Sequence, residues 1–254
     1  MARVVAVANQ KGGTGKTTTV VNLGVALGEA GQRVLVVDAD PQCNATMWLG
    51  VDYSAVTPST ADVFLDGMEV GETVVSTAFG VDLAPATVDL AAAEMELASR
   101  PDRGTILRAA LRGVGRRYDQ ILLDCPPGLG LLTVNGLAAA DELIVPVPTE
   151  ALGLEGVGQL QETVSRVRRQ LNRRLRVLGL LATRYDQRER VAQEVVERLR
   201  SDYGEPVFTT VIRRNVRLSE APAFQEPITR YSPQSRGAQD YRALAQEVLH
   251  ARRS

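Results

Sequence analysis

Cysteine, histidine and long apolar runs are all scarce in this chain of 254 residues. With only two cysteines, Cys43 and Cys125, the chain cannot build a disulfide framework, which indicates a reducing, cytoplasmic location. No run of about eighteen apolar residues occurs, so no transmembrane helix is expected. An apolar stretch begins almost at the first residue, which leaves no room for a signal peptide. The single histidine, His250, is expected to be a solvated surface residue.

Lysine is scarce in a more informative way. Of the 29 basic side chains only two are lysines, and both lie in the segment 11–18, KGGTGKTT. High-GC codon usage is the simplest interpretation of the general excess of arginine. The lysines kept at Lys11 and Lys16 therefore indicate a need for a compact, flexible ammonium, which a planar guanidinium does not replace.

The two lysines belong to a glycine-rich loop between an expected strand and an expected helix. The apolar residues 4–8 predict a buried strand, and helical spacing follows from Thr17 to Glu29. Glycines let backbone N–H groups converge on phosphate oxygens, and a helix N-terminus adds further unpaired N–H groups. The end of the loop matches the phosphate-loop pattern, although Gln10 stands where that pattern begins with glycine. The sequence thus predicts a variant phosphate-binding loop.

The pattern assigns a role to most residues of this loop. Lys16 is expected to reach the β- and γ-phosphates of a nucleotide, and the Thr17 hydroxyl to bind Mg²⁺. Thr18 is expected to contact the α-phosphate. The remaining cofactor-binding positions form the cradle: Gly12, Gly13, Thr14 and Gly15.

Carboxylates end two further apolar strands. Residues 34–37 lead into Asp38 and Asp40, within DADPQCNAT, and residues 120–123 lead into Asp124, within DCPPG. Carboxylates at the C-terminal ends of parallel strands point into the ligand crevice of an α/β sheet. A hydrophobic strand that ends in aspartate has the Walker B form, so Asp124 is expected to hold Mg²⁺.

Together these motifs resemble the ParA/MinD family of deviant Walker A P-loop ATPases. The block 211–222, VIRRNVRLSEAP, resembles the corresponding block of chromosomal ParA (Soj-type) proteins. The resemblance covers nearly the whole chain, from Val4 to the final expected helix. Two positions depart from the family pattern: Cys43 stands where glycine is usual, and Arg213 stands where proline is usual.

The resemblance implies roles for individual residues. Lys11, the signature lysine, would cross a dimer interface to the nucleotide of the partner protomer. Asp40 would position or activate the attacking water, which makes Asp40, Lys11 and Lys16 the expected catalytic residues. Asp38 would support the Mg²⁺ shell. Asn215 would contact the adenine base, or it would cap the helix that follows it.

The resemblance also implies a partition ATPase, with ATP and Mg²⁺ as cofactors. An ATP-bound homodimer would bind DNA without reading its sequence, and hydrolysis, stimulated by a ParB-like partner, would release the DNA. The nucleoid would then be its place in the cytoplasm. No stable membrane association is expected, since residues 244–254 include few bulky apolar side chains.

Charge is distributed unevenly along the chain. Residues 1–149 carry ten basic and seventeen acidic side chains, whereas residues 150–254 carry nineteen basic and thirteen acidic ones. This asymmetry indicates an anionic partner for the C-terminal half, although solvated helix faces account for many individual arginines. The expected DNA contacts are Arg184, Arg188, Arg190, Arg213 and Arg217, with Arg242 as a weaker candidate. The arginines of 166–176 compete with them.

Apolar strands alternate with helical patterns, which predicts an α/β fold: a doubly wound, mostly parallel sheet with helices on both faces. Residues 1–254 are expected to form a single P-loop ATPase domain without an N-terminal helix-turn-helix extension. The expected strands are 4–8, 34–37, 81–85, 120–124, 143–147, 177–183 and 207–212. The expected helices are 17–29, 59–65, 90–99, 105–114, 131–140, 154–171, 189–200 and 238–251.

Three other functions remain to be weighed. A MinD-like ATPase that binds membranes would need an amphipathic C-terminal helix with a bulky apolar face. An orphan ParA-like ATPase that positions another cargo would share the same fold and chemistry. A redox protein with a cluster across its dimer axis is disfavoured, because neither cysteine stands where that family places its ligand.

Overall fold

Seven strands form one sheet in the order β3-β4-β2-β5-β1-β6-β7, and every neighbouring pair is parallel except β3 with β4. The computed structural model describes residues 2–251. The strands are β1 (Arg3–Val7), β2 (Val34–Asp38), β3 (Val75–Ser76), β4 (Asp82–Ala84), β5 (Gln120–Asp124), β6 (Glu142–Pro148) and β7 (Arg176–Thr183). The expected α/β fold with a mostly parallel sheet is confirmed.

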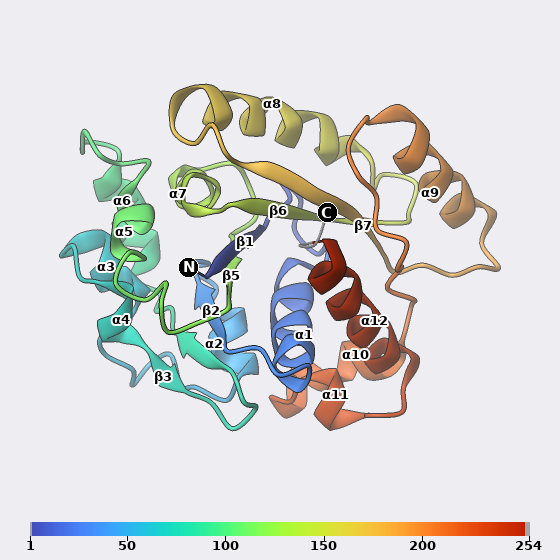
Figure 1. Ribbon diagram of the computed structural model, residues 1–254, viewed down its shortest axis with the longest axis horizontal. Coiled ribbons are helices and arrows are strands. Elements are labelled where there is room, and N and C mark those ends of the chain that lie inside the picture. The colour runs from blue at the N-terminus through green and yellow to red at the C-terminus, as the bar shows by residue number, and fades with distance from the viewer. Residues whose placement is uncertain (1, 252–254) are drawn as a thin grey trace.

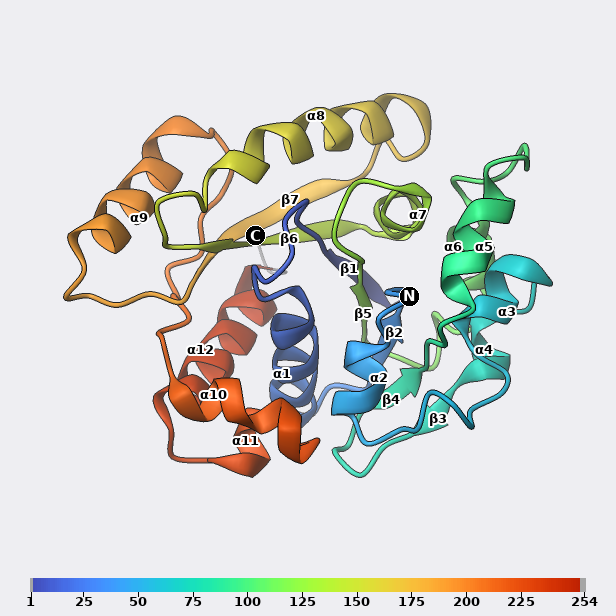
Figure 2. The same ribbon diagram turned by 180° about the vertical axis from the view of Figure 1, so that it is seen from behind.

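Helices cover both faces of this sheet (Figures 1 and 2). They are α1 (Lys16–Glu29), α2 (Asn44–Trp48), α3 (Thr60–Leu65), α4 (Val70–Thr73), α5 (Leu90–Leu97), α6 (Ile106–Ala110), α7 (Leu131–Ala139), α8 (Glu155–Gln170), α9 (Arg190–Asp202), α10 (Val216–Glu220), α11 (Ile228–Tyr231) and α12 (Arg236–His250). A 3₁₀ helix at Ala221–Phe224 joins α10 to the segment before α11.

The buried strands send alternate side chains to two separate cores. Leu35 and Leu123 pack with α3 and α5 to α9 on one face of the sheet, whereas Val36 and Leu122 pack with α1, α2 and α12 on the other. Because side chains alternate across a strand, a strand covered on both faces is apolar at every position. This explains why the central strands appear in the sequence as unbroken apolar runs.

Most of the predicted elements are present, with ends that differ by a few residues. The cap at Ser59 is confirmed: its hydroxyl accepts a hydrogen bond from the Ala61 N–H at 3.2 Å, and Asp62 accepts one from the Ser59 N–H at 2.7 Å. The helix predicted over 105–114 is shorter and covers only Ile106–Ala110. The antiparallel edge strand β3 and the short helices α2, α4, α10 and α11 were not predicted.

The strand predicted over 207–212 is wrong. Two isolated bridges, Leu180 to Val207 and Tyr185 to Arg213, and a hydrogen bond from the Ile212 N–H to the Ala182 carbonyl at 2.8 Å join this segment to β7 and the residues after it. Between the bridges, the N–H groups of Thr209 and Thr210 donate to the Glu247 carboxylate of α12, at 2.7 and 2.9 Å. Because these two amides bond to α12, the segment leaves the sheet in its middle and no continuous ladder forms.

No helix among residues 2–251 is both long and apolar enough to cross a bilayer.

Candidate functional site: a nucleotide site at the carboxyl edge of the sheet

The three predicted phosphate-site motifs meet at one edge of the sheet. β5 lies between β1 and β2, and in the strand register Asp124 is opposite both Val7 and Asp38. The glycine-rich loop leaves β1 at the same edge and leads into α1 (Figure 2). Segments more than a hundred residues apart in the sequence therefore converge where an open α/β sheet binds its ligands.

Two glycines shape the loop. Gly13 and Gly15 have φ angles of 70° and 97°, a left-handed conformation that other residues adopt only with strain. Gly15 is the N-cap of α1, and no side chain bonds to the N–H groups of its first turn. The helix thus begins with free donors and with the positive end of its dipole facing the loop, which suits an anion.

The Lys16 side chain lies inside this cradle. It is 6% exposed, and its ammonium donates to the Lys11 carbonyl at 3.0 Å. Burial lowers the pKa of Lys16, while the negative charges of Asp124 and Asp40 partly offset this effect. The ammonium thus lies near Asp124 at the end of β5 and near Asp40 after β2. A bound phosphate would lie against this ammonium.

Lys11 points away from the cradle, toward the start of α8. Its ammonium donates to Glu155 Oε2 at 2.6 Å and to the Leu152 carbonyl at 2.8 Å. The close approach requires Gly156, because a Cβ there would lie 2.9 Å from Asn9 Oδ1 and 3.5 Å from Lys11 Cγ. Both side chains of the ion pair are partly exposed, at 35% and 58%, so the pair contributes at most about 1 kcal/mol.

Asp38 is fully engaged within its own chain. Its Oδ1 accepts a hydrogen bond from the Asp40 N–H at 3.1 Å, and its Oδ2 accepts from the N–H and hydroxyl of Thr46 at 2.9 and 2.7 Å. Burial raises the pKa of Asp38 to about 6, against these hydrogen bonds. Asp38 therefore fixes the turn between β2 and α2, and its predicted support of a metal shell stays a prediction.

Asp40 lies on the turn that Asp38 fixes. It is 4% exposed, and its Oδ1 accepts a hydrogen bond from the Gln42 N–H at 2.9 Å. Burial raises the pKa of Asp40, and the nearby Lys16 charge lowers it. Its second carboxylate oxygen has no protein donor among the described residues, so that oxygen is available to a water molecule.

Asp124 has the environment expected of a carboxylate that binds a cation. It is fully buried, and within residues 2–251 no donor lies in good hydrogen-bonding geometry to either oxygen, although the Thr17 hydroxyl lies close enough to affect its charge. Burial and the Asp38 charge raise the pKa of Asp124 well above its usual value, and the Thr17 hydroxyl partly offsets them. An unpaired buried carboxylate is costly unless a cation compensates it. The residues therefore fit Mg²⁺ held between Asp124, Thr17 and a bound phosphate.

Two cavities flank the loop. One, of about 440 Å³, contains Lys16, Thr17, Thr18 and Asp40, and it extends to Trp48 of α2 and to the 3₁₀ helix. The other, of about 450 Å³, lies between the loop and the segment 212–215, and Tyr241 of α12 lines it. Gly13, Gly15 and Thr18 border both cavities, so a ligand with its phosphates on the loop can extend to either side.

Asn215 lines the second cavity and also caps α10. Its Oδ1 accepts a hydrogen bond from the Arg217 N–H at 2.9 Å. The capping role, one of the two that the sequence left open, is thus present. The amide nitrogen is not used in the cap, so the predicted contact to a base stays compatible with it.

Cys43 occupies a position that favours glycine. Its φ is 54°, it is the N-cap of α2, and its thiol donates to the Pro41 carbonyl at 3.4 Å. The side chain is 1% exposed, and burial raises the pKa of the thiol to about 12. Cys125 is fully buried, and burial raises the pKa of its thiol as well. Neither thiol is placed to bridge two protomers through a metal cluster.

This burial predicts that both thiols resist labelling. Ellman's reagent at neutral pH should modify neither cysteine in the native protein within minutes, and both in guanidinium, since a buried thiol that stays protonated is a poor nucleophile. Slow labelling of Cys43 alone would report opening of the turn between β2 and α2. Rapid native labelling of Cys125, with the fold intact by circular dichroism, would contradict the structure.

The five arginines predicted to contact DNA are already paired within the chain. Arg184 pairs with Glu150, Arg188 with Asp186, Arg190 with Glu194, Arg213 with Asp240 and Arg217 with Glu220, at 2.5 to 3.1 Å. Arg213 stands where the family usually has proline, and its Nε and Nη2 both donate to Asp240, whose side chain is 7% exposed. Their role in DNA binding stays a prediction.

Comparison with known proteins agrees with this site. The AAA domain family matches residues 2–177. Over 249 residues the chain is 46% identical to the sporulation initiation inhibitor protein Soj of Bacillus subtilis. The match covers 98% of this chain and 98% of that protein. It is 51% identical over 247 residues to the chromosome-partitioning ATPase Soj of Thermus thermophilus, covering 97% of this chain and 95% of that one. The chain belongs to the ParA/Soj family of partition ATPases.

Solved structures with bound nucleotide and magnesium share this fold. One is a cobyrinic acid a,c-diamide synthase from Mycobacterium smegmatis with bound ATP analogue and magnesium. The match covers all of this chain and 97% of that chain, at 40% identity and with a TM-score of 0.89. The septum site-determining protein MinD from Pyrococcus horikoshii, complexed with Mg-ADP, matches at 29% identity over 98% of this chain and 96% of its own, with a TM-score of 0.78. This member of the ParA/Soj family is an ATPase with a P-loop fold.

Several residues at the site were not predicted from the sequence. Thr46 anchors Asp38, Glu155 holds Lys11, and the Trp48 indole N–H donates to the Glu226 carbonyl at 2.8 Å, which ties α2 to the segment after the 3₁₀ helix. Thr46 stands eight residues after Asp38 in the DADPQCNAT block, so a local signal existed. Glu155 and Glu226 lie far along the chain and carried no such signal.

Proposed function

We propose that this ParA/Soj-family ATPase is a partition protein of a single domain, residues 1–254. It binds ATP and Mg²⁺, forms a homodimer around the nucleotides, and in that state holds DNA without reading its sequence. A ParB-like partner stimulates hydrolysis, after which the dimer and its DNA complex come apart. Its place is the cytoplasm, on the nucleoid. The cycle would drive chromosome or plasmid segregation.

The observation that carries this proposal is the position of Lys11. It lies on the open side of the phosphate loop, outside the cradle that Lys16 occupies. Lys16 and the free N–H groups of α1 would bind the phosphates of a nucleotide in the same protomer. Lys11 is therefore not required for that contact. Its contact with Glu155 is weak enough to be given up for the stronger attraction of a triphosphate on a second protomer.

The expected chemistry divides among few residues. Bound Mg²⁺ would supply positive charge to the β- and γ-phosphates. Thr17 and Asp124 would hold the ion, and Lys16 would hold the phosphate oxygens. Asp40, with one free carboxylate oxygen, would orient the attacking water. Asn215 and the second cavity would receive the base.

The test is nucleotide-dependent dimerisation. We expect light scattering to show a monomer with ADP and a dimer with a non-hydrolysable ATP analogue and Mg²⁺. We further expect gel shift to show DNA binding that is stronger with the analogue than with ADP and weaker as salt rises. A chain that stays monomeric at saturating analogue would overturn the proposal.

Replacing Lys11 with alanine tests the role of that residue directly. Because Lys11 lies outside the cradle, Lys11→Ala is expected to change ATP affinity by less than about threefold while weakening the ATP-dependent dimer by about tenfold or more. Fluorescent nucleotide binding and light scattering measure the two effects separately. Equal loss of both would place Lys11 on the nucleotide of its own protomer.

The structure does not favour the MinD-like alternative. The apolar residues of α12, among them Tyr241, Leu244 and Val248, are buried against α1 and are not free to enter a lipid surface. Pelleting with anionic liposomes in the presence of ATP tests this directly, and we expect the protein to remain in the supernatant.

A further inference from the structure

Arg184 has a strained backbone conformation directly after β7. Its φ angle is 55°, a left-handed value that it shares with two other non-glycine residues of the described chain, Cys43 and Gln225. Those two residues cap the ends of α2 and of the 3₁₀ helix, whereas Arg184 is at no helix end. Strain of this kind persists only where the surrounding structure maintains it, and it is concentrated at functional sites.

Hydrogen bonds on both sides hold this turn. Before it, the Thr183 hydroxyl donates to the Thr14 carbonyl of the phosphate loop at 2.9 Å. After it, the Tyr185 N–H donates to the Ile212 carbonyl at 3.0 Å. The turn thus joins the phosphate loop to the segment 212–215, and both of these line the second cavity, of about 450 Å³.

The side chain of Arg184 lines the same cavity and reaches the phosphate loop. Its Nη2 would lie 3.7 Å from a Cβ placed on Gly13, so the guanidinium lies beside the loop. The guanidinium donates to Glu150 at 3.1 Å, and the two side chains are 51% and 48% exposed. An exposed pair of this kind is weak, so Arg184 can leave Glu150 for a ligand, as Lys11 can leave its own carboxylate.

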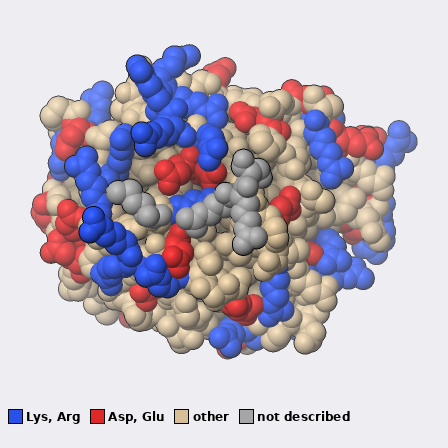
Figure 3. Space-filling model, in the orientation of Figure 1, with Lys and Arg blue, Asp and Glu red and all other residues tan. Residues whose placement is uncertain are grey.

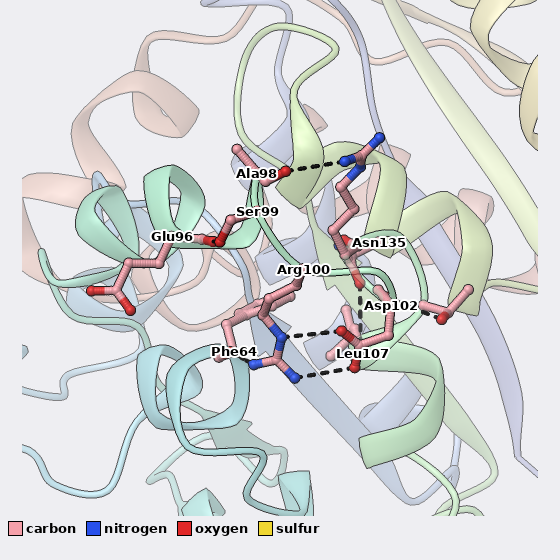
Figure 4. Close-up of polar contacts among 10 residues, drawn as sticks. Phe64, Glu96, Ala98, Ser99, Arg100, Asp102, Leu107 and Asn135 are labelled. Atoms are coloured by element: carbon pink, nitrogen blue, oxygen red, sulfur yellow. Dashed lines mark hydrogen bonds and ion pairs between the residues drawn. The ribbon is translucent and has the colours of Figure 1, made fainter.

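The charge of Arg184 would not by itself indicate a ligand. Lys and Arg side chains lie beside Asp and Glu over much of the surface in Figure 3. Some arginines fasten the fold: Arg100 donates to the Phe64 carbonyl at 3.0 Å and to Asp102, which ties the end of α5 to α3 (Figure 4). The Arg184 side chain donates to no backbone carbonyl within residues 2–251, so the fold does not explain its strained placement.

Two other arginines line the second cavity. Arg213 donates to the nearly buried Asp240, and separation of this pair would leave a buried charge without a partner. Arg214 forms an exposed pair with Glu189, but its backbone is not left-handed. Of the three, only Arg184 combines a weak ion pair, a strained turn and a guanidinium beside the loop glycines.

We propose that Arg184 closes the second cavity over the nucleoside of a bound nucleotide, with its guanidinium plane stacked on the base. The inference rests on the proposed function, in which this cavity receives the base, and it adds a residue that determines how tightly the base is held. A guanidinium is planar and stacks on the face of an aromatic ring, whereas an ammonium is a compact point charge. Leu218 and Pro222, which also line the cavity, would supply apolar contacts to the same base.

The experiment separates contact with the base from contact with the phosphates. Isothermal titration calorimetry measures binding of Mg-ADP and of magnesium pyrophosphate, which has the phosphates but no nucleoside. ADP is used because it is expected to leave the protein monomeric, so dimerisation does not enter the measured affinity. Thermal unfolding without ligand measures the stability of each variant.

Three variants are compared with the wild type. Arg184→Gly removes the side chain and lets the backbone adopt its φ of 55° without strain. Arg184→Lys keeps the charge and the aliphatic stem but lacks the plane. Arg198→Gln is the matched control, because it removes another exposed arginine with a carboxylate partner, in α9.

We expect Arg184→Gly to bind ADP about tenfold more weakly and to bind pyrophosphate within about twofold of wild type. Its melting temperature should be equal to that of wild type or a few degrees higher, since glycine relieves the strain. Arg184→Lys should recover only part of the lost ADP affinity, and Arg198→Gln should bind both ligands as the wild type does.

Four results would overturn the inference and leave the proposed function intact. Unchanged ADP affinity in Arg184→Gly would make Arg184 a surface residue. An equal loss for pyrophosphate would assign it to the phosphates. Full recovery in Arg184→Lys would assign the effect to charge and not to stacking. A lower melting temperature together with loss of both ligands would make Arg184 a structural support of the loop.

The wild type provides the separate test of the proposed function. Wild-type protein that binds ADP no more tightly than pyrophosphate would show that the second cavity receives no base. That result would defeat the base-binding part of the proposed function, and this inference with it.

Discussion

Lys16→Ala is expected to weaken ATP binding by about 100-fold or more. Lys16 is the one ammonium inside the phosphate cradle, and it is almost fully buried there beside Asp40 and Asp124. Removing one partner of a buried, hydrogen-bonded charge pair costs about 2–5 kcal/mol, and each 1.4 kcal/mol is a factor of ten in affinity. Isothermal titration calorimetry with ATP and Mg²⁺ measures the change.

A conservative variant separates charge from shape at this position. Lys16→Arg keeps the positive charge, but a planar guanidinium does not fit where the ammonium donates to the Lys11 carbonyl at 3.0 Å. We expect it to bind ATP nearly as poorly as the alanine variant. Thermal unfolding of both variants without nucleotide should differ from wild type by a few degrees at most. ATP affinity within threefold of wild type in Lys16→Ala would remove Lys16 from the site.

Asp40→Ala is expected to retain ATP and to lower the rate of hydrolysis by about 10²- to 10⁴-fold, the usual contribution of a group that acts on the reacting water. Among the described residues the Asp40 side chain accepts a single hydrogen bond, from the Gln42 N–H, so removal of this side chain leaves the cradle and the metal ligands in place. ATP-bound dimers should therefore accumulate. Phosphate release measures the rate, and light scattering with ATP itself measures the trapped dimer.

Asp40→Asn is the matched control for the shape of this turn. The amide oxygen can still accept from Gln42, but the side chain no longer carries a charge with which to orient or activate water. Loss of hydrolysis in both variants assigns a chemical role to the carboxylate. Full activity in the asparagine variant would reduce Asp40 to a residue that positions the turn, and undiminished hydrolysis in the alanine variant would exclude it from the reaction.

The sequence was most informative where function and local structure depend on contiguous residues. The glycine-rich loop, Asp38, Asp40 and Asp124 each follow an apolar strand, and parallel strands bring such positions to one edge, so the convergence of the three motifs was predictable. The alternation of apolar strands and helical patterns likewise predicted the α/β sheet. Helix ends were placed less well, because they depend on caps and on packing with distant segments.

What could not be predicted depends on contacts between distant residues. The segment 207–212 has the composition of a strand, but the Glu247 carboxylate on α12 takes two of its amides. The exposed arginines could not be separated into paired and unpaired ones, because the partner of Arg213 lies 27 residues away and that of Arg184 lies 34 residues away. An ion pair with a carboxylate reduces the positive charge that an arginine presents to an external anion. Which arginines are paired depends on the fold.

The hydrogen bonds and the ion pair that join residues 209–213 to α12 also affect nucleotide binding in the second cavity, between the phosphate loop and residues 212–215. Glu247 holds the stretch before Ile212, and Asp240 holds both the N–H and the guanidinium of Arg213, so one wall of that cavity is clamped to a long helix packed on α1. Little conformational freedom is left there for an arriving nucleotide to remove. Association at this side should therefore carry a small entropic penalty, and mutations that loosen the clamp should slow capture even though they touch no ligand atom.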